Sequence, residues 1–137
     1  MRIPVALLLA ALLASPALAE DDAAAPKHKV TQSESYVAFE PIYATIVDAG
    51  KPCGMLMVHF GLDIPNEDLR DEATRGLPVL RDAYVRNILS FTATAVRPWQ
   101  QPDVNTISDR LQHLTDRALK KKGARILLAQ VAMRISR

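Results

Sequence analysis

Apolar side chains alternate with polar ones along two neighbouring stretches of the chain. From residue 55 to 64, one face carries Leu56, Val58, Phe60, Leu62 and Ile64, and the other carries Met55, Met57, His59, Gly61 and Asp63. The preceding stretch 36–47 is rich in β-branched and aromatic residues, and turn-forming residues fill 48–52. This pattern predicts a β-hairpin. Its first strand is either an edge at Pro41 or begins at Ile42, because proline lacks an amide donor.

Helical spacing follows the hairpin. Asn66 is suited to cap a short helix that is interrupted at residues 76–78, where Pro78 fits the first turn of a new or kinked helix. The main helix then carries an apolar stripe at intervals of three and four, made of Leu77, Leu80, Tyr84, Ile88, Phe91 and Ala95. After two prolines, a further helix has the stripe Val104, Ile107, Leu111, Leu114 and Ala118. We expect that helix to end with Gly123 as its left-handed cap.

The chain closes on a strand from Ala124 to Ser136. Its predicted buried face is Leu127, Ala129, Val131, Met133 and Ile135, and the apolar start at Ile126 and Leu128 favours a strand flanked on both sides. The order strand, strand, helix, helix, strand predicts an α+β fold. We expect a β-hairpin, two helices and a C-terminal strand, forming a small antiparallel or mixed sheet with the helices packed on one face.

The first nineteen residues are typical of an export signal. Arg2 precedes the apolar run 3–13, and the stretch ends on Ala17-Leu18-Ala19. This pattern predicts a signal peptide, residues 1–19, cleaved after Ala19 and delivering the protein to the periplasm; an uncleaved anchor is the alternative. Residues 20–35 are polar and are predicted to be a disordered leader, which makes 36–137 the folded domain.

Composition argues against several classes of function. Without residues 1–19, the chain has 118 residues and a formal charge of +1, so no overall charge favours nucleic acid. The single Cys53 excludes a disulfide within the chain, and we interpret it as a half-buried small residue. The three histidines are too scattered to bind one metal, and no motif for a nucleophile or a phosphate is present. We therefore predict a non-catalytic protein without metal or cofactor.

Surface side chains remain as candidate contacts for a partner. Three lie on the polar side of the main helix, one lies between two prolines, and three form a basic group with Arg125: Arg81, Asp82, Arg86, Trp99, Lys120, Lys121 and Lys122. Each has a simpler explanation. The charged residues of the main helix are expected on a solvated face where they pair with one another, and the simpler explanation for the indole of Trp99 is that it packs against the core and attaches its loop there. The lysines suit either helix capping and solubility or contact with anionic headgroups or an acidic partner.

One segment resembles a known family. Residues 77–85 read Leu-Pro-Val-Leu-Arg-Asp-Ala-Tyr-Val and are followed by Ile88-Leu89-Ser90, which is similar to the signature of the flagellar basal-body-associated protein FliL. The flanking Phe39-Glu40-Pro41, Gly61-Leu62-Asp63 and 126–133 are similar to the strands of the family's periplasmic domain. The resemblance spans about 36–134. It implies a stomatin-like, non-enzymatic domain in which Pro78, Arg81 and Asp82 define the helix start and a subunit or partner contact.

The resemblance also implies association with the stator or basal body of the flagellar motor, where the domain modulates motility. Members of the family ordinarily keep a transmembrane helix, whereas this chain begins with what resembles a removable signal, which leaves docking on a membrane complex or peripheral membrane contact as the expected attachment. An alternative function is a small secreted ligand-binding or inhibitor domain that uses the sheet face carrying Met55, Met57 and His59.

Overall fold

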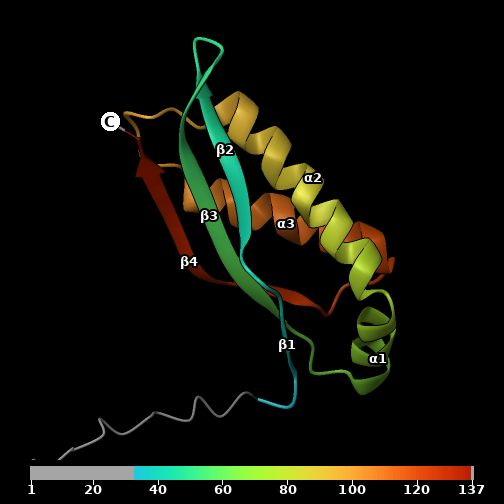
Figure 1. The fold of residues 1–137 in the computed structure, drawn as a ribbon. Coiled ribbons are helices and arrows are strands. Elements are labelled where there is room, and N and C mark those ends of the chain that lie inside the picture. The colour runs from blue at the N-terminus through green and yellow to red at the C-terminus, as the bar shows by residue number, and fades with distance from the viewer. Residues whose placement is uncertain (1–32, 137) are drawn as a thin grey trace, which may run out of the picture. The chain divides into compact units, whose positions relative to one another are not determined.

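The computed structural model describes residues 33–136, which form a four-stranded antiparallel sheet and three helices (Figure 1). The predicted α+β fold class is confirmed. One strand and one helix more are present than the predicted order contained. In chain order, the elements are β1 (Tyr36–Ala38), β2 (Ile42–Asp48), β3 (Lys51–Asp63), α1 (Glu67–Arg75), α2 (Leu77–Ala95), α3 (Val104–Leu119) and β4 (Arg125–Ile135).

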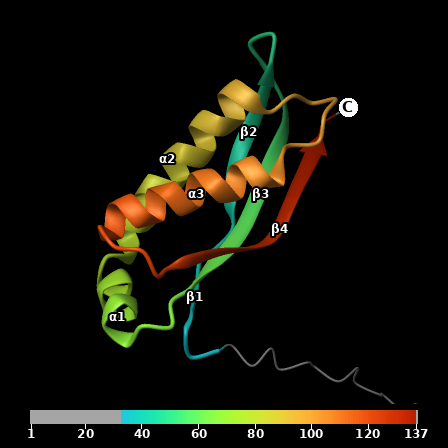
Figure 2. The ribbon, with the colours of Figure 1, turned by 180° about the vertical axis from the view of Figure 1, so that it is seen from behind.

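The long strand β3 is the centre of the sheet. It pairs with β4 along 54–63, and its other edge is shared by β1 along 61–63 and β2 along 51–58. All three helices lie on the same side of this sheet (Figures 1 and 2). The sheet is therefore only three strands wide, and its opposite side has no second layer within residues 33–136.

The hairpin forms as the sequence predicts. Ala49 and Gly50 are the two loop residues, with φ of 48° and 77°, and Asp48 pairs with Lys51. Positive φ at both loop positions gives the turn whose twist matches that of the strands. At the other end of the first strand, Phe39 and Pro41 bracket a break between β1 and β2. Of the two alternatives for Pro41, the second is correct, because Pro41 lies outside the strands and β2 begins at Ile42.

The helices begin where the local chemistry predicts. The Asn66 side chain accepts a 2.9 Å hydrogen bond from the Leu69 amide and caps α1, and α2 starts with Pro78 in its first turn. The predicted stripes need correction at their ends, however. Ala95, Val104 and Ala118 are exposed, and the positions buried in their place are Val96, Thr115 and Leu119. The Thr115 hydroxyl can be buried because it donates to the Leu111 carbonyl at 2.7 Å.

Three expectations for the C-terminal part are wrong, and one of them is the buried face of the last strand, because Leu127 is not part of the core and Ala129 and Ile135 are exposed. Lys120, with φ of 54°, takes the left-handed cap of α3 in place of Gly123. Strand β4 pairs only with β3, so within the described chain it is an edge strand and is not flanked on both sides. A register shift opposite His59 and Phe60 separates two halves of β4. Before it, Ile126 and Leu128 face the core and Leu127 does not, whereas after it Val131 and Met133 face the core.

The side chain of Gln112 attaches the start of β4 to α3. Its amide nitrogen donates to the Ala124 carbonyl at 2.7 Å, and its amide oxygen accepts from the Ile126 amide at 2.9 Å. Ala124 and Ile126 are both buried. This one side chain thus satisfies two backbone groups that no neighbouring strand satisfies.

Replacing Gln112 with leucine should lower the free energy of unfolding by about 2 kcal/mol, because the Ala124 carbonyl and the Ile126 amide lose their partners. Urea unfolding of the purified domain measures the change. His113→Leu is the matched control, since His113 is the adjacent residue of α3 and is exposed. Equal changes in the two variants would show that the amide bridge contributes nothing.

The expected leader is only partly within the described chain. Its last residues, 33–35, form a turn in which the Ser33 carbonyl accepts from the Tyr36 amide at 2.9 Å. Ser35 is held more firmly, since its hydroxyl donates to Asp63 at 2.6 Å and its carbonyl accepts from the Ile64 amide. Disorder is therefore the wrong prediction for 33–35. The expected signal and residues 20–32 lie outside the described residues. Among 33–136, no helix combines the length and apolarity that a membrane span requires.

Candidate functional site

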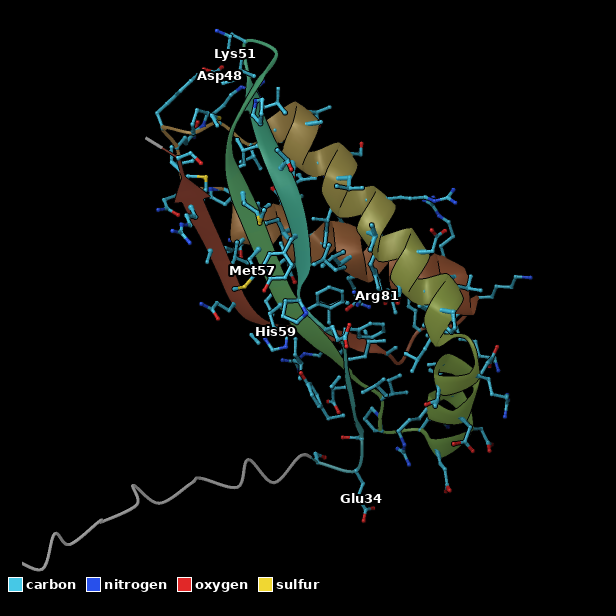
Figure 3. The ribbon with its side chains drawn as sticks, in the orientation of Figure 1. Glu34, Asp48, Lys51, Met57, His59 and Arg81 are labelled. Carbon is cyan, nitrogen blue, oxygen red and sulfur yellow. The ribbon has the colours of Figure 1, made fainter. Side chains whose placement is uncertain are left out.

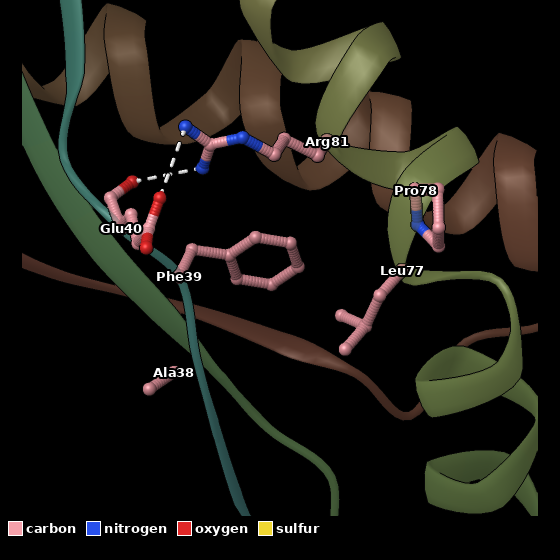
Figure 4. Close-up of a pocket in the computed structure, with 6 residues that line it drawn as sticks. All are labelled: Ala38, Phe39, Glu40, Leu77, Pro78 and Arg81. Atoms are coloured by element: carbon pink, nitrogen blue, oxygen red, sulfur yellow. Dashed lines mark hydrogen bonds and ion pairs between the residues drawn. The ribbon is translucent and has the colours of Figure 1, made fainter.

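Arg81, the first candidate contact, is bound to its own chain. Its guanidinium donates to the Glu40 carbonyl at 3.3 Å and lies 3.6 Å from the Glu40 carboxylate (Figure 4). These contacts tie the break between β1 and β2 to the first turns of α2. Beside them is a mainly apolar hollow of about 340 Å³, lined by Ala38, Phe39, Glu40, Leu77, Pro78 and Arg81. The structure therefore brings together Phe39-Glu40 and the Leu77-Pro78 start of the main helix.

Asp82 and Arg86 form an ion pair of 3.1 Å one turn apart on α2. Both side chains are largely exposed, at 61% and 78%. Such a pair contributes only a few tenths of a kcal/mol, roughly, to a helix. The three helix charges thus form the solvated, ion-paired face that was the simpler interpretation, and they remain accessible to a partner.

The three consecutive lysines are near acidic neighbours. Lys121 lies 3.7 Å from Glu72 of α1, a helix that also carries Glu67, Asp68 and Asp71. Lys120 is the αL cap of α3. Glu72 therefore offsets part of the positive charge of Lys121, which weakens the attraction of that lysine for anionic headgroups.

Trp99 projects into solvent, with 72% of its surface exposed. It lies in a tight turn closed by a bridge between Arg97 and Gln100, whose amide donates to the Arg97 carbonyl at 3.2 Å. The Arg97 guanidinium donates to carbonyls of Thr94 and Val96 at the end of α2. The alternative prediction, that the Trp99 indole packs against the core and holds its loop there, is therefore wrong.

The far side of this loop is also fixed. The Asp103 carboxylate accepts hydrogen bonds from the Thr106 hydroxyl at 2.9 Å and from the Asn105 and Thr106 amides, which caps α3. These bonds, above all that from the Thr106 hydroxyl, lower the pKa of Asp103 below its usual value. The loop 96–103 lies beside the C-terminal end of β4 in both views (Figures 1 and 2). A rigid frame thus presents the exposed indole next to the sheet.

The second exposed region is the side of the sheet that faces away from the helices. Met57 and His59 project from it (Figure 3). Tyr43, Val47 and Met55 are exposed by 57%, 47% and 46% on the same side. A hollow of about 260 Å³ is lined there by Tyr43, Met55, Met57, Ala132, Met133 and Arg134. We call this side the open face. Sequence reasoning noted Met55, Met57 and His59 but missed Tyr43 and Arg134, whose cross-strand neighbours depend on the register.

Buried polar groups in the core have structural partners. Tyr84 and Thr115 are 2.6 Å apart, and because the Thr115 hydroxyl already donates to Leu111, Tyr84 donates to Thr115. Burial raises the pKa of Tyr84 to about 12. The Cys53 thiol is half-buried and donates to the Ile46 carbonyl at 3.5 Å. Within 33–136, no three side chains among His, Cys, Asp and Glu gather as metal ligands.

No family model matches the chain, and none of the curated proteins is significantly similar to it. The features of its surface are therefore the basis for a functional proposal.

Proposed function

We propose that this chain is a non-catalytic periplasmic interaction domain of the FliL type, which associates with the stator or basal body of the flagellar motor and modulates motility. The resemblance of residues 77–90 supports the family, and the exposed indole of Trp99 is the observation that carries the interaction. An exposed tryptophan on a rigid turn is a typical anchor for a protein partner. Arg81, Asp82 and Arg86 supply polar contacts in this proposal, and Lys120, Lys121 and Lys122 are secondary.

Small-molecule binding on the open face, which carries Met55, Met57 and His59, is the weaker alternative. The hollow on the open face is about 260 Å³, whereas ligand sites usually enclose about 300–1,000 Å³. A thermal-shift screen tests this alternative, since a small molecule that stabilises the domain would favour it over the motor.

The decisive experiment for the motor is crosslinking in intact cells with the chain tagged at Arg137, followed by mass spectrometry. The proposal expects stator or basal-body proteins in the membrane fraction and a mature N-terminus at Glu20. A free periplasmic monomer without such neighbours would rule out the motor role. A soluble mature protein bound to motor components would support a FliL-type accessory protein.

Trp99→Ala should reduce the crosslinked yield of that partner about thirtyfold, the effect of losing a hot-spot side chain of about 2 kcal/mol. The melting temperature should stay unchanged, because the indole is exposed. His113→Ala is the matched control, since His113 is also exposed but lies on α3 and belongs to none of the proposed contacts. Equal yields from the two variants would count against Trp99 as an anchor.

A further inference from the structure

The open face has two rows of side chains that run across the whole sheet. In one row, Tyr43 of β2 pairs with Met57 of β3, which pairs with Ala132 of β4. In the next, Thr45 pairs with Met55, which pairs with Arg134. Within residues 33–136 nothing packs over these rows. They combine an exposed phenol ring, two thioethers and a methyl group into one apolar surface, of a kind that monomeric proteins usually cover.

Arg134 is the one cation in these two rows of the described strands. Arg134 is exposed, and no hydrogen bond or ion pair joins its guanidinium to another group in the described part of the chain. Arg70, Arg81 and Arg97 are bound within the domain, to the Ile64 carbonyl, to Glu40 and to the end of α2. What distinguishes Arg134 from the remaining exposed arginines is its place beside Met55 in one of the two rows. The two rows contain no carboxylate. An apolar occupant with one negative charge would therefore complement them.

The width of the sheet indicates what kind of segment would fit. Neighbouring strands are about 4.8 Å apart, so β2 and β4 are separated by roughly 10 Å across β3. An α-helix with its side chains is about 10–12 Å in diameter. A helix laid along the strands would thus be about as wide as the separation between β2 and β4, and a helix packed on a sheet is a common way to bury such a face.

We propose that the open face is a docking site for an amphipathic α-helix of a protein partner, whose apolar side packs on Tyr43, Met55 and Met57 and whose carboxylate binds Arg134. This inference rests on the proposed interaction function and adds the chemistry of the partner segment. Arg134 can donate two parallel hydrogen bonds to one carboxylate, which fixes the register of the helix along the strands.

Photo-crosslinking of the full chain in the producing cells tests the site. A benzophenone amino acid replaces Tyr43, whose ring it resembles and whose surface is 57% exposed. The same probe at His113, which is exposed on α3 and belongs to no proposed contact, is the control. We expect an adduct from position 43 with an amphipathic helical segment that has Asp or Glu on its apolar side. Arg134→Glu should reduce the adduct about tenfold or more, and Arg134→Lys less. The melting temperature should not change.

Several results would overturn the docking site: no adduct at position 43, a lipid or small-molecule adduct, or an adduct with residues 20–32 of this chain or with a second copy. An adduct yield at position 43 that is the same with and without Arg134→Glu would also overturn the docking site. If a motor protein is crosslinked only from a probe at Trp99, the proposed function is supported and the helix site is refuted. If an acidic helix of a protein outside the motor is crosslinked at position 43, the helix site is supported and the motor role is refuted.

A charge exchange completes the test. A synthetic peptide of the crosslinked helix should bind the purified domain, and Arg134→Glu should weaken its affinity about tenfold. Changing the peptide carboxylate to lysine should restore binding to the Arg134→Glu variant. Failure of this exchange to restore binding would show that Arg134 does not contact that carboxylate.

Discussion

Replacing Phe60 with alanine should lower the free energy of unfolding by about 3–5 kcal/mol. Phe60 is fully buried at the centre of an aromatic cluster. Its ring stacks on Phe39 with centroids 5.4 Å apart and meets the ring of Tyr84 edge-on at 5.0 Å. Phe39 and Tyr84 also meet edge-on, at 5.3 Å. The cluster joins the sheet to α2, so the variant loses both buried area and about 0.5–1.5 kcal/mol for each aromatic pair.

Equilibrium urea unfolding measures this loss against the roughly 5–15 kcal/mol that a domain of this kind has in total. Tyr43→Ala is the matched control, because it removes an aromatic ring from the same sheet on the open face. That variant should stay within about 0.5 kcal/mol of the unaltered protein. A loss below about 1 kcal/mol for Phe60→Ala would mean that α2 is not anchored through these rings.

Elements governed by local chemistry could be predicted from the sequence. The turn predicted within 48–52, the Asn66 cap and the break before Pro78 each depend on a few adjacent residues, and all three are present, the turn being confined to Ala49 and Gly50. The alternation in β3 was equally reliable, because every predicted core residue from Leu56 to Ile64 is buried. Short-range geometry leaves few alternatives at such positions.

Elements governed by distant contacts could not be predicted as well. The stripe of α3 includes Thr115, which a hydrophobicity pattern passes over because it does not show the hydroxyl donating to Leu111. The face of Leu127 in β4 depends on the register shift beside Phe60, and such shifts leave no periodic signal. Gln112 is an ordinary helix residue in sequence, and its role depends on the path of β4 over α3.

The same distinction applies to the candidate surfaces. Trp99 stood out by its residue type, but only its exposure decides between anchor and core contact. Arg81 stood out through the resemblance, whereas its contact with Glu40 depends on the break between β1 and β2. The role of Arg134 could not be predicted from the sequence, because its proximity to Met55 follows from the pairing of β3 with β4. A docking face assembled from three strands has no signature in any one of them.

Raising the pH from 8.5 to 11 should destabilise the protein by about 1.4 kcal/mol more than it destabilises a Tyr84→Phe variant. The unfolded chain loses the Tyr84 proton near pH 10, whereas the buried phenol keeps it up to a pKa of about 12. Between these values the unfolded state binds fewer protons than the folded state, so stability falls as the pH rises. The contribution of Tyr84 is complete below pH 10 and is lost through pH 12.

Urea unfolding of both proteins at the two pH values gives this difference directly. At pH 8.5, Tyr84→Phe itself should cost about 1 kcal/mol, because the bond to Thr115 is lost while Thr115 still donates to Leu111. Tyr43→Phe is the control on the exposed side and should show the full alkaline loss. Parallel alkaline losses in the original protein and in Tyr84→Phe would contradict the prediction, because they would mean that the Tyr84 phenol ionises in the folded state as readily as in the unfolded chain, despite its contacts with Phe39, Phe60 and Thr115.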